Sequence, residues 1–92
     1  MRRIVRCFIV YNRVRLIMTN DEQKLLNQLA IKIKFQRNEL GISQEKLAEK
    51  CDFDRTYISL LERAKRNPSY LSLKKLCHGL EIELSDLLTE SI

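Results

Sequence analysis

Apolar residues recur at three- and four-residue intervals between residues 21 and 40, a spacing that predicts an amphipathic helix. The apolar stripe of this helix is formed by Leu26, Leu29, Ala30 and Ile33. Polar residues such as Lys34 and Asn38 lie outside the stripe. Gly41 follows where glycine commonly ends a helix. The pattern therefore predicts a long helix from Asp21 to about Leu40.

Four shorter helices are expected after Gly41, because residues that favour helix N-caps precede four further runs of helix-forming residues. These N-cap candidates are Ser43, Asp54, Ser69 and Ser85. The expected helices cover residues 44–50, 55 to about 63, 70 to about 80, and a last short segment that ends at 88. Asn67 and Pro68 separate the third and fourth of the five helices, since proline cannot continue a helix.

The composition favours an all-α fold in a single domain. A chain of 92 residues is too short for two hydrophobic cores, and 45% apolar with 32% charged residues is typical of a globular protein. One Pro, two Gly and no Trp provide few of the turn residues that an all-β fold requires.

The segment that precedes Met18 differs in composition from the remainder. It is rich in Arg, Val and Ile, and Tyr11 with Asn12 is a candidate turn, so a basic β-hairpin and an amphipathic helix are both plausible. Thr-Asn-Asp-Glu-Gln after Met18 is typical of a protein start and of a capped helix N-terminus. We therefore divide the chain into a basic N-terminal extension, 1–18, and a folded domain, 19–92. A tail without a defined function is the alternative for the extension.

Metal and catalytic chemistry are not indicated. Cys7, Cys51 and Cys77 are an odd number of cysteines without a CxxC pair, and the single His78 completes no familiar zinc-binding spacing. We expect no metal and no cofactor in a reduced, cytoplasmic protein. No nucleophile is paired with a base, so no catalytic residue and no enzyme activity are predicted. The apolar runs are too short for a signal peptide or a membrane span.

The net charge of +5 is unevenly distributed. Residues 1–18 carry five arginines and no acid, so the remaining 12 bases and 12 acids cancel. Residues 24–75 hold those 12 bases with six acids, whereas residues 76–92 hold four acids and no base. This polarity is expected of a protein that turns one face toward a polyanion such as nucleic acid. An ordinary charged, solvated surface is the alternative.

The second and third expected helices are short, and three residues separate them. Two such helices, the second with a polar outer face, are typical of a helix-turn-helix motif. Ala48 lies where the two helices should cross, and its small side chain permits a close approach of the backbones. The apolar positions expected to interlock are Leu47, Ala48, Cys51, Phe53, Ile58 and Leu61.

The sequence resembles the lambda-repressor-like family, also called the Xre or Cro type, over residues 25–88. The matching stretches are GISQEKLAEK, DRTYISLLER and NPSYLSLKKLCHGLEIELSDLL. The resemblance implies a compact five-helix bundle, and it is strongest to the controller proteins of restriction-modification systems. Asp52 and Glu81 stand where the family often has Gly, and Gln36 where Leu is common. Asp tolerates the left-handed conformation better than most residues, so the first departure is compatible with the turn.

The helix that begins at Arg55 is expected to read DNA bases. With Ile58 facing the core, a projection at 100° per residue places four residues on the outside: Thr56, Ser59, Leu60 and Arg63. Arg can bind guanine O6 and N7, Thr or Ser can bind either type of base, and Leu can contact a thymine methyl. The predicted base contacts are Arg55, Thr56, Ser59 and Leu60.

Phosphate contacts are implied by the resemblance for residues that flank this helix. The matched positions are Gln44, Tyr57, Arg66 and Asn67. The Gln44 position in the family also braces the recognition helix. The resemblance further implies a structural ion pair between Arg37 and Glu62, which should be partly buried and orient that helix.

A homodimer is expected, because one recognition helix contacts too few base pairs for useful specificity. The C-terminal part has more apolar residues than a short terminal helix needs, and the predicted dimer interface consists of Ile82, Leu84, Leu87 and Leu88. Closure of the monomer's own core by these residues is the alternative. Pairing through the N-terminal extension is another.

The leading interpretation is a sequence-specific transcriptional regulator of the controller type. It should bind a palindromic operator in double-stranded DNA as a homodimer, and it should act on its own promoter. RNA polymerase is a further candidate partner, whereas no membrane and no small-molecule effector are expected. The alternative is a phage-type repressor, or an antitoxin whose main partner is a toxin protein.

Overall fold

The computed structural model describes the backbone of residues 15–88 and the side chains of residues 21–88. All regular elements in this part of the chain are helices, which confirms the all-α fold and the five helices. They are α2 (Arg15–Glu39), α3 (Gln44–Cys51), α4 (Arg55–Glu62), α5 (Tyr70–Leu80) and α6 (Leu84–Leu88). The predicted β-hairpin or helix of the extension falls on 1–14 for most of its length and so lies outside the described residues.

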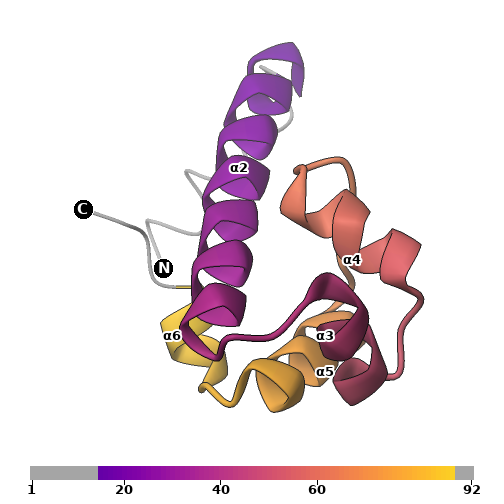
Figure 1. The fold of residues 1–92 in the computed structure, drawn as a ribbon. Coiled ribbons are helices and arrows are strands. Elements are labelled where there is room, and N and C mark those ends of the chain that lie inside the picture. Colours follow the sequence, from indigo (N-terminus) through magenta and orange to yellow (C-terminus); the bar gives the residue numbers. More distant parts are fainter. Residues whose placement is uncertain (1–14, 89–92) are drawn as a thin grey trace.

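Helix α2 is the longest element, with 25 residues. Figure 1 shows it as a rod with the four shorter helices packed beside its C-terminal half, while its N-terminal end extends beyond them. The helix begins at Arg15, so the prediction of a capped start near Asp21 was wrong. Arg, Leu and Met are good helix formers, and they carry the helix through Thr19 and Asn20, two types of residue that also favour caps. The boundary between extension and domain remains a prediction.

Four helices end in the same way, with a residue in the left-handed conformation. The residues are Gly41, Asp52, Ala64 and Glu81, with φ values of 69°, 62°, 58° and 61°. In each, the N–H of that residue and the next N–H donate to carbonyls of the last turn; for Asp52 and Phe53 these are Glu49 and Ala48. This is the Schellman pattern of helix termination. Two of the sequence's departures from Gly, Asp52 and Glu81, therefore lie where a left-handed residue is required.

Three of the predicted N-caps occupy the residue before a helix. Ser43 and Ser69 accept hydrogen bonds from the N–H groups of Lys46 and Ser72, as expected. Asp54 precedes α4 but makes no side-chain cap bond. The predicted cap at Ser85 was wrong, because α6 begins one residue earlier, at Leu84. The carbonyl of Glu83 accepts the first bonds of this helix, from Asp86 and Leu87.

The core is formed by side chains from all five helices. Those with almost no exposed surface are Ile33, Leu47, Ile58, Leu61, Leu76, Leu80 and Leu87. Ala48 of α3 is buried, and α3 packs against α4 and α5. Gln36, where the family often has Leu, donates through Nε2 to the carbonyl of Leu80 at 3.1 Å and so satisfies the end of α5. The core fixes α3 against α4, the pair of helices that forms the candidate interface.

Candidate nucleic-acid interface

Helices α3 and α4 form a helix-turn-helix unit. The turn is closed by a 2.8 Å hydrogen bond from the N–H of Phe53 to the carbonyl of Ala48. Leu47 of α3 and Ile58 and Leu61 of α4 lie in the shared core, which fixes the angle between the helices. The remaining face of α4 is directed outward.

The four predicted base-reading residues are brought together on α4. Arg55 and Thr56 are exposed in its first turn, whereas Ser59 and Leu60 are half-buried. Arg63, which the sequence interpretation left out of the site, lies at the end of the helix one turn after Ser59. Its Nε donates to the Ser59 carbonyl at 3.4 Å, and the side chain is exposed. The helical projection had already placed Arg63 on the outer face with Ser59, and this was the signal that could have added it to the site.

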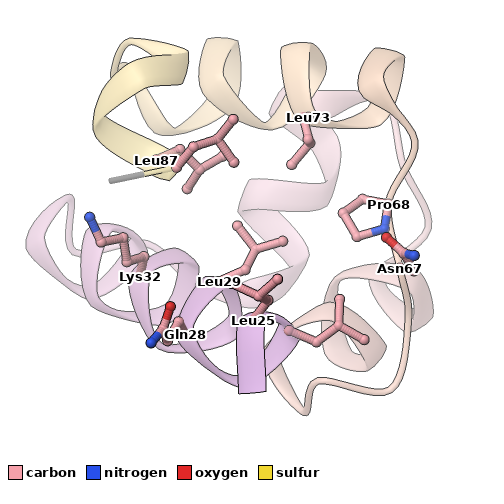
Figure 2. A pocket seen from close by; sticks show the side chains of 10 residues that line it. Leu25, Gln28, Leu29, Lys32, Asn67, Pro68, Leu73 and Leu87 are labelled. Carbon is pink, nitrogen blue, oxygen red and sulfur yellow. The ribbon is translucent and has the colours of Figure 1, made fainter. Parts of the chain in front are cut away.

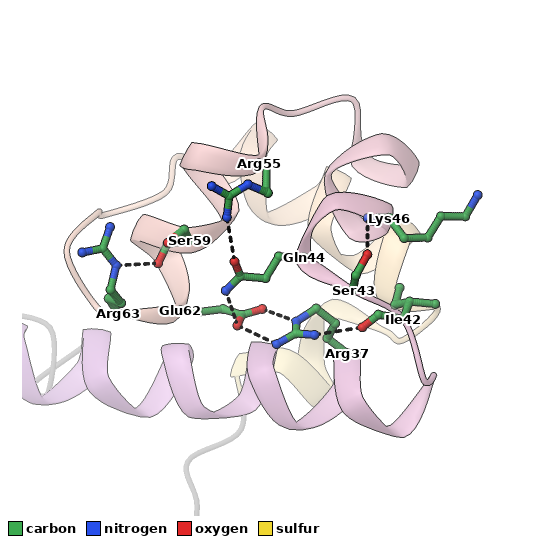
Figure 3. A network of polar contacts seen from close by, with 9 residues as sticks. All are labelled: Arg37, Ile42, Ser43, Gln44, Lys46, Arg55, Ser59, Glu62 and Arg63. Atoms are coloured by element: carbon green, nitrogen blue, oxygen red, sulfur yellow. Dashed lines mark hydrogen bonds and ion pairs between the residues drawn. The ribbon is translucent and has the colours of Figure 1, made fainter.

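A network of polar contacts lies between α4 and α2, as Figure 3 shows. Nε and Nη2 of Arg37 donate to the two carboxylate oxygens of Glu62 at 2.6 and 3.0 Å, and Nη1 donates to the Ile42 carbonyl at 2.8 Å. Nε2 of Gln44 donates to Oε1 of Glu62 at 3.0 Å, and Nη1 of Arg55 donates to Oε1 of Gln44 at 3.4 Å. The side chains of Arg37 and Glu62 are only 12% and 2% exposed. The ion pair therefore ties α2 to the end of α4.

Tyr57, in the first turn of α4, belongs to an aromatic and polar cluster. Its ring is 4.7 Å from that of Phe53, centroid to centroid, and the guanidinium carbon of Arg66 is 5.9 Å from its centroid. The Tyr57 hydroxyl donates to Oγ of Ser72 at 3.2 Å. Arg66 and Asn67, the other predicted phosphate contacts, are exposed in the loop after α4.

The charge around α4 is positive on the outer side. Arg55, Arg63, Lys65 and Arg66 are exposed, and so are two acids before the helix, Asp52 and Asp54. The one acid within the helix, Glu62, is buried against Arg37. The buried carboxylate is neutralised locally, so it does not cancel the field of the exposed bases. The arrangement attracts an anionic ligand of extended shape.

The predicted dimer residues do not share one environment. Leu87 is 1% exposed and belongs to the monomer's core, so its burial contradicts the expected place in a dimer interface. Ile82 and Leu84 are half-buried, and Leu88 is 52% exposed. The sequence interpretation was wrong about Leu87 because a short helix on a small core must direct one leucine inward.

Two apolar grooves adjoin α6. Figure 2 shows the first, between α2 and α5, with Leu25, Leu29, Leu73 and Leu87 directed into it and Pro68 at one side. The second has these lining residues: Ile31, Lys32, Phe35, Gln36, Ile82, Asp86 and Leu87. Ile31 and Phe35 are 64% and 62% exposed, so one wall of this groove is an apolar surface open to solvent.

The cysteines of the described part are buried and free. Burial raises the pKa of Cys51 from 9.0 to about 11, against the opposing effect of a backbone hydrogen bond with Gly79. Burial also raises the pKa of Cys77. Raised pKa values keep both thiols protonated near neutral pH and so make them poor nucleophiles. Residues 21–88 contain no cluster of three or more His, Cys, Asp or Glu arranged to hold a metal ion.

Comparison with known proteins identifies the family. The family described as Helix-turn-helix matches residues 33–87, more than half of the chain. Control protein C.BamHI of Bacillus amyloliquefaciens is 41% identical over 71 residues, which cover 77% of this chain and 85% of that protein. The chain belongs to the helix-turn-helix family of restriction-modification control proteins.

Solved structures of control proteins have the same fold. C.AhdI of Aeromonas hydrophila is 35% identical with a TM-score of 0.66, over 67% of this chain and 94% of that chain. C.Esp1396I, solved as a tetramer with its natural 35 base-pair operator, is 42% identical with a TM-score of 0.65, over 70% and 88% of the two chains. These relatives confirm the resemblance to controller proteins that the sequence predicted. Within the described part, no helix is long and apolar enough to cross a membrane.

Proposed function

We propose that the chain is a sequence-specific transcriptional regulator of the restriction-modification controller type. The observation that carries this proposal is the outer face of α4, where Arg55 and Thr56 are exposed on a helix that the core and the Arg37–Glu62 pair hold rigidly. A rigid helix with such residues in its first turn suits the major groove of double-stranded DNA. The chain then acts by binding and not by catalysis.

The site divides into groups that read bases and groups that bind phosphates. Arg55 and Thr56 read base edges from the first turn, with Ser59 and Leu60 behind them on the same face. Gln44, Tyr57, Arg66 and Asn67 contact the phosphate backbone on either side. The Tyr57 hydroxyl now donates to Ser72 in a bond that is 3.2 Å long and only part-buried. A phosphate oxygen can therefore replace Ser72 as the acceptor.

The functional unit is a homodimer. Ile82 lines the same groove as the exposed α2 residues Ile31 and Phe35, and Leu88 lines the other groove. With Leu84, these residues supply an apolar surface for a second copy. A two-fold symmetric dimer presents two α4 helices to two half-sites of a palindrome. The structure of C.Esp1396I contains a tetramer on its operator, so in that protein too several copies bind one DNA site.

Regulation follows from concentration and not from a small-molecule effector. In this proposal the occupancy of the operator depends on how much dimer is present. A regulator of this design acts on its own promoter, with RNA polymerase as the partner it recruits or excludes there. Its place of action is the compartment that holds the DNA, the bacterial cytoplasm. The relatives include control proteins and a phage immunity repressor, and they give the alternative of an antitoxin no support.

Selection from randomised double-stranded DNA tests the proposal. The full chain should enrich a palindrome with half-sites centred about one helical turn apart, roughly 10 base pairs. Arg55→Ala and Thr56→Ala should relax the enriched sequence at separate positions in each half-site. Enrichment of no sequence at salt concentrations near 150 mM would exclude a sequence-specific regulator.

A further inference from the structure

The apolar groove between α2 and α5 is open to solvent. Figure 2 shows Leu25, Leu29, Leu73 and Pro68 at one end of it and Leu87 at the other. Leu25 is 52% exposed although it lines the groove, and Leu29 and Leu73 are only half-buried. The groove has a volume of about 270 Å³. An apolar cavity of about 150 Å³ is sufficient to bind benzene, so this groove can take a large apolar side chain.

Residues 1–14, which precede α2, have a composition that favours burial. Nine of these residues are apolar: the uninterrupted run Cys-Phe-Ile-Val-Tyr at 7–11, and Met1, Ile4, Val5 and Val14 outside it. An apolar run of this kind gains free energy when it is removed from water. Four arginines flank the run, and their long side chains can keep the charge in water while the run is buried.

The run is close enough along the chain to reach this groove. Helix α2 begins at Arg15, so Leu25 and Leu29 lie about 15 and 21 Å along the helix from it, at 1.5 Å per residue. Phe8, in the middle of the N-terminal segment, precedes Arg15 by seven residues and can lie up to about 23 Å from it in an extended chain. A chain that reverses its direction before α2 therefore brings the run beside the groove.

We propose that residues 7–11 dock in this groove of their own chain. A segment that is joined to the domain has a high effective concentration at the groove, so it occupies the groove ahead of a second copy. Docking at the end formed by Leu25, Leu29 and Leu73 leaves Ile31 and Phe35, in the other groove, free for the proposed dimer. The inference goes beyond the proposed function and does not depend on DNA binding.

Disulfide formation in the full chain tests the docking, because Cys7 belongs to the docking run. Cys51 and Cys77 are buried, so they compete poorly for oxidation. Gln28→Cys places a thiol on a residue that lines the groove. Under mild oxidation at low protein concentration, Cys7 and the new thiol should form a disulfide within one chain.

Asn27→Cys is the matched control. Asn27 precedes Gln28 on α2, so a free extension would reach the two positions equally, but Asn27 is exposed and does not line the groove. Gln28→Cys should therefore form its disulfide at least about tenfold faster than Asn27→Cys. Phe8→Asn, combined with Gln28→Cys, removes an aromatic side chain from the run and should slow the reaction to the rate of the control.

The other outcomes would overturn the proposal. Equal rates for Gln28→Cys and Asn27→Cys, or no disulfide in either, would show that the extension does not dock in this groove. A disulfide between two chains, which doubles the mass and forms faster at higher protein concentration, would assign the groove to the extension of a second copy. An unchanged rate after Phe8→Asn would show that the apolar run does not drive the contact.

Discussion

Gly79 of α5 and Cys51 of α3 approach so closely that no side chain fits between them. A Cβ atom added to Gly79 would lie 2.3 Å from Sγ of Cys51 and 3.2 Å from Cδ1 of Leu47. The contact lies in the part of the core that holds the helix-turn-helix unit against α5. Glycine is required here by packing and not by backbone conformation, because Gly79 is an ordinary residue within a helix.

Gly79→Ala should therefore lower the free energy of unfolding by about 1–3 kcal/mol, through overpacking. Cys51→Ala removes the sulfur that the new methyl group meets, so the double variant should recover part of the loss. Urea denaturation of the two single variants and the double variant measures this coupling. Strict additivity of the two substitutions would show that the helices separate freely and that the contact does not constrain them.

The stability of the protein should fall above pH 9. Burial raises the pKa of Cys51 to about 11 in the folded protein, whereas an unfolded thiol titrates near the ordinary value of 9.0. The unfolded state thus loses its proton first, and the stabilisation that is complete below pH 9 is lost as the pH rises toward 11. At pH 10.5 the loss due to Cys51 should be about 2 kcal/mol.

Cys51→Ala isolates this contribution, because the other titrating groups remain. Chemical unfolding at pH 8 and pH 10.5 should show a smaller decrease in stability for the variant than for the wild type. Equal decreases in the two proteins would assign the pH dependence to other groups, such as lysines.

Asp52→Gly should stabilise the turn of the helix-turn-helix unit. Asp52 has φ 62° and ψ 46°, a conformation that glycine adopts without steric cost. The expected gain is about 0.5–1 kcal/mol, since the strain of a residue with a Cβ is partly offset by the greater freedom of an unfolded glycine. Asp52→Ala keeps the Cβ and should show no gain. Thermal unfolding of the pair compares them, and an equal Tm for both would contradict the conformational argument.

Phe35→Lys and Leu88→Lys should separate the proposed dimer. The two side chains are 62% and 52% exposed, so a lysine at either position should leave the monomer's stability nearly unchanged. In a dimer interface the same changes should weaken association by about thirtyfold or more. Leu71→Lys is the control, because Leu71 is 72% exposed on α5 and outside the proposed surface. Sedimentation equilibrium that gives the same association constant for all three variants would place the interface elsewhere.

Much of the fold was predictable because its signals are local. Ser43, Ser69 and Gly41 mark helix ends by short-range hydrogen bonds or by a left-handed backbone, and the structure has them in those roles. The start of α2 and the cap of α6 were predicted wrongly, because such local signals can be ambiguous. Residues that favour caps are also compatible with the first turns of a helix, and at Ser85 the tertiary packing of Leu87 decides.

The site was predictable in its members but not in its connections. The residue types on α4 and the resemblance to the family were sufficient to select Arg55 and Thr56. The bond from Arg55 to Gln44 joins residues 11 positions apart, and it exists only because α3 and α4 cross at one angle. Exposure of Ile31 and Phe35 was equally hidden, because it depends on which helices cover α2.

The most direct test of the account compares Arg55→Ala with Arg66→Ala on one operator. Footprinting and quantitative binding at near-physiological salt should show wild-type protection of two half-sites about one helical turn apart. Arg55→Ala should lose about 1–3 kcal/mol of specific binding and retain nonspecific binding. Arg66→Ala should weaken binding to all sequences and lower the slope of log K against log salt by about one. Equal losses of specific and nonspecific binding in both variants would contradict the claim that α4 reads the bases.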